Sequence, residues 1–221
     1  MIRNSFKFVI RRNGFTLIEM IVAITIFVLV VVSVYSIHSL SQKFYRETEA
    51  MAEISQNGRV ILERITREIR QAKELVTELA DEETGASSTL EFEDGHTPAP
   101  PRYQELGSEY YYIRYYIPAD TQNLNRQYRV YCFDNCDFTN CQPQSDTCTN
   151  VCPSTGYHRW NATRESPTPT STHPCVLEDR TIGEYVAGLG FWGWPVINVS
   201  TSLEKEDKSI NLRTKVFGRN L

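Results

Sequence analysis

An apolar stretch of 21 residues near the N-terminus, residues 15–35, constrains this chain more than any other feature. It contains one charged side chain, Glu19. As a helix rising ~1.5 Å per residue, the stretch is roughly 31 Å long, which matches the hydrocarbon core of a bilayer. The sequence therefore predicts a membrane-spanning helix over residues 15–35.

The residues before this helix are basic. Residues 1–14 carry four basic side chains and no acidic one, whereas the whole chain has a net charge of −4, so residues 15–221 carry −8. The positive-inside rule places the N-terminus in the cytoplasm and the rest of the chain on the other side of the membrane. The acidic body gives no electrostatic reason to expect a nucleic-acid partner.

Glu19 needs an explanation. A charge inside a membrane helix costs on the order of 2.5–3.5 kcal/mol, and such residues usually have a partner. No Lys or Arg lies in residues 15–42, so the partner has to come from outside this segment. An ordinary signal anchor leaves Glu19 unexplained, as does a cleaved secretory signal peptide. The apolar stretch is also longer than the ~7–15 residues usual in secretory signals.

The basic leader, Gly14, the sequence "FTLIE" and the apolar helix together resemble the class III signal of type IV pilins and pseudopilins. The resemblance implies that prepilin peptidase cleaves between Gly14 and Phe15 on the cytoplasmic face and that Phe15 is then N-methylated. It also implies that Glu19 pairs with the N-terminal amine of a neighbouring subunit during assembly. Cleavage creates an α-amino group with a pKa near ~8, which supplies the missing cation.

Residues 36–80 continue the helical pattern as an amphipathic stalk. Apolar residues recur every three or four positions, and charged residues occupy the opposite face. One helix over residues 15–80 would be roughly 97 Å long at ~1.5 Å per residue. Asn57-Gly58 is the weakest point that we expect within it.

Residues 81–221 are predicted to form a globular β domain. A short strand is expected at residues 89–93, a first hairpin from residues 110–117 and 127–133, a strand within 182–194, and a second hairpin from 197–203 and 210–216. The predicted fold class is α+β, a long N-terminal helix packed on an antiparallel sheet. The tracts "NGRVILERITREIRQA", "VAGLGFWGW" and "INLRTKVFGRN" resemble J-type minor pseudopilins of type II secretion and PilW-like minor pilins equally well.

A cysteine-rich insert is predicted at residues 134–175. It is poor in apolar residues, so cross-links would replace a core, and we expect three disulfides with the pairing left open. The candidates are Cys132, Cys136, Cys141, Cys148, Cys152 and Cys175. Their clustering also favours an oxidising, extracytoplasmic compartment.

Metal binding by the insert is the alternative that we keep open. Zinc could use Cys132, Cys136, Cys148, Cys152 and His158, but the spacing is Cys-x₃-Cys and not the usual Cys-x₂-Cys. Calcium could bind at Asp134 and Asp137, where a solvated loop is the simpler interpretation.

No catalytic constellation is visible, because the four histidines lack a metalloprotease or nucleophile context and no phosphate-binding loop occurs. We therefore predict a structural, non-enzymatic subunit of the inner membrane without a cofactor. Prepilin peptidase, other minor and major pilin-like subunits and an inner-membrane assembly platform would be its partners. It would join the tip or initiation complex of a type II secretion pseudopilus. The alternatives are a type IV pilus minor pilin whose cysteine-rich insert binds a ligand or adheres to a host surface, and a non-polymerising membrane-anchored extracytoplasmic binding protein or enzyme.

Overall fold

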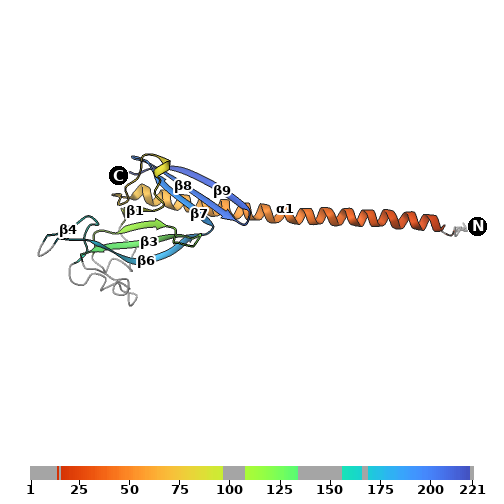
Figure 1. The fold of residues 1–221 in the computed structure, drawn as a ribbon, viewed down its shortest axis with the longest axis horizontal. Helices are drawn as coiled ribbons and strands as arrows, with labels where there is room; N and C mark the ends of the chain where they lie inside the picture. Colours follow the sequence, from red (N-terminus) through yellow and green to blue (C-terminus); the bar gives the residue numbers. More distant parts are fainter. Residues whose placement is uncertain (1–13, 15, 97–107, 134–155, 166–168, 220–221) are drawn as a thin grey trace, which may run out of the picture. The chain divides into compact units, whose positions relative to one another are not determined.

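The computed structural model describes residues 14, 16–96, 108–133, 156–165 and 169–219. The chain divides into two compact units, Met1–Thr48 and Glu49–Leu221, which are described separately. One long helix, α1 (Leu17–Gln71), begins in the first unit and ends in the second. The remaining secondary structure consists of a short 3₁₀ turn, η1 (Glu83–Gly85), and antiparallel strands (Figure 1).

The stalk helix ends at Gln71, nine residues before the end predicted from the sequence. Residues 73–77 instead form hydrogen bonds with the strand β1 (Leu90–Glu93). The backbone N–H of Lys73 donates to the Glu93 carbonyl (3.1 Å) and that of Val76 to the Glu91 carbonyl (2.9 Å). These hydrogen bonds to a distant strand replace the hydrogen bonds of a helix. The apolar periodicity of residues 72–80 cannot reveal such a long-range pairing, because it reports only on local structure.

The first sheet has four antiparallel strands in the order β1-β2-β3-β6. Its other members are β2 (Tyr112–Tyr116), β3 (Leu124–Cys132) and β6 (His173–Gly183). The predicted pairing of residues 110–117 with 127–133 is confirmed, with β3 beginning three residues earlier than expected. A separate pair is formed by β4 (Thr163–Arg164) and β5 (Thr170–Ser171).

The strand β6 was not predicted, and it overlaps the end of the predicted insert at residues 173–175. Its sequence, HPCVLEDRTIG, contains a proline and a run of charged residues, so it lacks the apolar alternation typical of a strand. Polar side chains take part in its pairing with β3, where Gln127 and Asp179 are partners and the Gln127 Nε2 atom donates to an Asp179 carboxylate oxygen (2.8 Å).

The second sheet contains β7 (Val186–Trp192), β8 (Val196–Lys205) and β9 (Lys208–Phe217) in that order. The predicted hairpin from residues 197–203 and 210–216 is confirmed, and Glu206 in its turn has a positive φ of 53°. The sequence led us to expect one antiparallel sheet, whereas the strands divide into separate antiparallel sheets. The coarser prediction of a long helix with antiparallel β-structure is confirmed.

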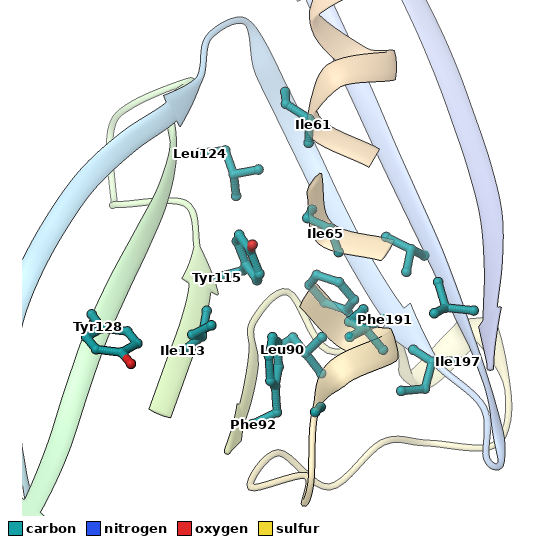
Figure 2. Packing of buried hydrophobic residues seen from close by; sticks show 14 of the residues in the cluster. Ile61, Ile65, Leu90, Phe92, Ile113, Tyr115, Leu124, Tyr128, Phe191 and Ile197 are labelled. Carbon is teal, nitrogen blue, oxygen red and sulfur yellow. The ribbon is translucent and has the colours of Figure 1, made fainter. Parts of the chain in front are cut away.

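The hydrophobic core of residues 49–221 forms where α1 meets side chains of both sheets. Figure 2 shows Ile61 and Ile65 of α1 with Leu124 and Tyr115 from one sheet and Phe191 and Ile197 from the other. Tyr115, Ile65, Leu124, Phe191 and Ile197 are fully buried. Burial of each such side chain contributes ~1.5–3 kcal/mol to the free energy of unfolding. The predicted apolar stripe of the amphipathic stalk therefore packs α1 against the β-structure.

Two glycines allow the helix to approach both sheets closely. A Cβ atom on Gly58 would lie 2.4 Å from Leu212 Cδ1 and 2.9 Å from Leu203 Cδ1. A Cβ atom on Gly183 would lie 2.3 Å from Ile61 Cδ1. The expected weak point at Gly58 is therefore a contact site, and α1 continues through it without interruption.

A polar cluster also joins the stalk to the first sheet. The Tyr115 hydroxyl donates to Glu68 Oε2 (2.5 Å), and Arg126 Nε donates to the same oxygen (2.9 Å). Burial, followed by the Glu68 charge, raises the pKa of Tyr115 well above its ordinary value. This satisfied network places α1 against β2 and β3 with a geometry that apolar contacts alone would not specify.

Candidate functional site

Gly14, the predicted residue before the cleaved bond, is exposed and precedes α1. A Cβ atom placed on it would meet no heavy atom within 4 Å. A larger side chain would therefore not disturb the fold, and a requirement for glycine here would have to come from the peptidase. Phe15, the predicted methylation site, lies outside the described residues.

Thr16 is the N-terminal cap of α1. Its carbonyl accepts the backbone N–H of Met20 (3.2 Å), and its hydroxyl accepts the backbone N–H of Glu19 (3.4 Å). In return, Glu19 Oε2 accepts both the Thr16 N–H (2.9 Å) and the Thr16 hydroxyl (2.9 Å). This is a capping box, in which a Thr and a Glu three residues later satisfy donors at a helix start.

The capping box was missed in the sequence analysis, although its signal, Thr-x-x-Glu before an apolar run, is present at residues 16–19. Both hydrogen bonds from Thr16 to the Glu19 carboxylate reach Oε2. Thr16 thus orients the carboxylate without neutralising its charge. The positive end of the helix dipole also favours an anion in this first turn.

Three hydroxyl side chains within or next to the apolar segment form hydrogen bonds within their own helix. The hydroxyls of Thr25, Ser33 and Ser36 donate to the carbonyls of Ile21, Leu29 and Val32, respectively, at 2.8–2.9 Å. Large apolar side chains from Leu17 to Tyr45 are exposed, and α1 is long and apolar enough to cross a membrane. Glu19 is therefore the charge in this segment that still needs a counter-charge.

Residues 10–35 match the family model of the prokaryotic N-terminal methylation motif. The match covers the end of the leader, the Gly14-Phe15 bond, Glu19 and the apolar helix. It indicates a pilin-like protein that is processed by prepilin peptidase, and the apolar part of α1 fits a single-pass membrane anchor. No curated protein and no solved structure matches the chain.

Two of the six cysteines lie in the described part of the chain. Cys132 at the end of β3 and Cys175 in β6 are both buried, and their Sγ atoms are 3.5 Å apart. Cys132 is disulfide-bonded, but its partner is not Cys175, because the sulfur atoms of a disulfide lie only ~2.05 Å apart. Cys136, Cys141, Cys148 and Cys152 lie outside the described residues, so the three-disulfide framework stays a prediction.

The metal alternatives are likewise untested. Asp134 and Asp137 lie outside the described residues, as do three of the four candidate zinc cysteines, Cys136, Cys148 and Cys152. Within the described ranges, no group of three or more His, Cys, Asp or Glu side chains is arranged to hold a metal ion. His158 is bound to β3, because its backbone N–H donates to the Tyr131 carbonyl (2.9 Å) and its ring centroid lies 4.2 Å from that of Phe133.

Proposed function

We propose that this protein is a minor pilin-like subunit that joins the tip or initiation complex of a type II secretion pseudopilus. In this role it is a structural component and neither an enzyme nor a cofactor carrier. It waits in the inner membrane with its N-terminus in the cytoplasm and its β-structure outside. After cleavage it is inserted into the filament with other minor and major subunits by the inner-membrane assembly platform.

The observation that carries the proposal is the state of Glu19. Its carboxylate is held through Oε2 by Thr16 at the start of a membrane-capable helix, and residues 15–42 contain no basic side chain. Cleavage after Gly14 would create an ammonium group at Phe15 of each subunit. A carboxylate and an ammonium in a low-dielectric setting form a strong charge-assisted contact, and leaving either one unpaired costs ~3–5 kcal/mol.

The second candidate is a minor pilin of a type IV surface pilus. The tracts at residues 57–72, 186–194 and 210–220 resemble PilW-like minor pilins as well as J-type pseudopilins, and a cysteine-rich insert suits a ligand-binding role. A non-polymerising membrane-anchored protein remains the third candidate, and it would leave the charge of Glu19 without a function. Genes adjacent to this one would distinguish secretion from surface pili, since each system has its own secretin and platform components.

The experiment replaces Glu19 by Val and, as a matched control, by Gln. Glutamine keeps the capping-box acceptor but removes the charge, whereas valine removes both. We expect both variants to be membrane-inserted and cleaved, and both to lose incorporation with the other pilin-like subunits. Incorporation is measured by co-purification and by cysteine cross-linking between neighbouring helices.

The outcomes separate the charge from the helix cap. Wild-type incorporation of Glu19→Gln together with loss of Glu19→Val would assign the role to the capping box and contradict charge pairing. Normal incorporation of both variants would exclude any assembly role of Glu19. Failure of cleavage in both variants would move the function of Glu19 from assembly to processing.

A further inference from the structure

Exposed apolar side chains gather at one end of the second sheet. Among the described residues of 49–221, five large apolar side chains are exposed: Met51, Val60, Trp194, Val196 and Phe217. Trp194 (55% exposed) lies in the turn between β7 and β8, Val196 (39%) begins β8, and Phe217 (62%) ends β9. Apolar side chains clustered in this way on a surface commonly mark an interaction site.

The backbone of this corner is held in place before any partner binds. Val196 and Phe217 are directly opposite partners on the antiparallel strands β8 and β9. Their neighbours Ile197 and Val216 are buried in the core, so Val196 and Phe217 face the opposite side of the sheet. In the turn, the Gly193 N–H donates to the Ala80 carbonyl (2.7 Å), and Asn198 Nδ2 donates to the Trp192 carbonyl (3.2 Å). A fixed backbone lowers the ordering cost of association.

Two basic residues lie close to Phe217 in the chain. Lys215 lies on the same face of β9 as Phe217, and Arg219 follows Phe217 by two residues; both are exposed. In the described part of the chain, no carboxylate lies within ion-pair distance of either side chain. Arg213, next along the same face, differs, because Glu83 binds its two Nη atoms at 3.0 and 2.6 Å. We refer to Trp194, Val196, Phe217, Lys215 and Arg219 as the apolar–basic corner.

We propose that the apolar–basic corner docks a different protein through a segment that presents apolar side chains among carboxylates. An apolar centre with a polar border is the usual composition of a protein interface. Because neither cation has a carboxylate partner among the described residues, charge complementarity favours an acidic segment, although the net charge of the protein is itself negative. This inference does not depend on which kind of filament the protein enters.

Two other occupants fit the corner less well. A second copy docking through the same corner would place Lys215 and Arg219 against their own counterparts, and like charges across an interface are unfavourable. Membrane-surface binding usually needs a broad apolar face with many basic residues. The corner offers three apolar side chains and two cations, and neutral Asn198 and Ser200 continue along the same face of β8.

The test is site-specific photo-cross-linking of the full-length protein in its native host. The photoreactive residue p-benzoylphenylalanine replaces Phe217 and, as a control, Asn211, which is exposed on the same face of β9. We expect an adduct at position 217 that is at least fivefold more abundant than at position 211. Its cross-linked peptide, identified by mass spectrometry, should belong to another protein and carry more carboxylates than basic groups.

Charge reversal completes the test. Lys215→Glu should reduce the abundance of the adduct at position 217 at least fivefold. The control is Arg164→Glu, which removes an exposed cation of β4 and makes the same change in net charge. It should leave the abundance of the adduct at position 217 unchanged. Protease resistance in the membrane fraction verifies that both variants are folded. Equal adducts at positions 217 and 211, an adduct to a second copy or to lipid, or an adduct insensitive to Lys215→Glu would each overturn the proposal.

Discussion

Replacing Gly58 by alanine tests how closely the stalk helix packs on the second sheet. At an exposed position in the middle of a helix, Gly→Ala stabilises by ~1 kcal/mol, because alanine has the higher helix propensity. Gly58 is buried, however, and the added Cβ atom would lie 2.4 Å from Leu212 Cδ1 and 2.9 Å from Leu203 Cδ1. Carbon atoms in contact are ordinarily ~3.5–4.0 Å apart.

The two leucines differ in how easily they can move. Leu203 is fully buried in the core, whereas Leu212 is half-buried on β9, an edge strand of the second sheet. Overpacking of a filled core costs ~1–3 kcal/mol. After subtraction of the ~1 kcal/mol propensity gain, we expect Gly58→Ala to lower the free energy of unfolding by about 1 kcal/mol.

The assay is pulse proteolysis across a urea gradient, applied to the detergent-solubilised full-length protein. Gly58→Ala is compared in the wild-type and in the Leu212→Ala background, in which the nearest clashing atom is absent. The substitution should be neutral or stabilising in the second background, which gives a coupling of ~1–2 kcal/mol between the two positions. Gln56→Ala, on the exposed face of α1, should change stability by less than ~0.5 kcal/mol. A stabilisation of ~1 kcal/mol by Gly58→Ala in both backgrounds would refute the close approach.

Three further predictions concern processing, pH and redox state. Gly14→Leu should block cleavage without changing the fold. Intact-mass analysis of the wild-type protein should show a chain that begins at N-methylated Phe15. A chain that begins elsewhere would contradict the assigned cleavage site. Burial, followed by the Glu93 and Glu74 charges, raises the pKa of Tyr112 from 10.0 to about 12. Because the folded state keeps this proton longer, the associated stability is present below pH 10 and is lost as the pH rises from 10 to 12. Tyr112→Phe should therefore reduce the loss of stability by up to ~1.4 kcal/mol per pH unit in urea titrations. Mass mapping without reduction should find all six cysteines in disulfides, and six free thiols with bound zinc would contradict this.

Several parts of the fold could be predicted from the sequence because their signals are local. The apolar length of residues 15–35 predicts the membrane-capable helix, and the match of residues 10–35 to the methylation motif supports the processing signal within it. The strict alternation of apolar and polar residues predicts the β8–β9 hairpin, because one face of that sheet is buried against α1. The capping box of Thr16 and Glu19 was equally local and could have been read from the sequence.

Other features depend on pairings between distant residues, which only the tertiary structure reveals. The stalk helix ends at Gln71 because residues 73–76 bond to β1, some 17 positions further along the chain. The strand β6 carries polar residues that look like a loop in the sequence, yet its Asp179 is satisfied by side chains of β2 and β3. Gly58 looked like a weak point of the helix until Leu203 and Leu212 were placed against it. The sequence by itself therefore determined the membrane-capable helix, the processing signal at its start and the alternating strands. Long-range hydrogen bonds and close packing decided where the helix ends, which polar strand completes the first sheet, and which apolar side chains stay exposed.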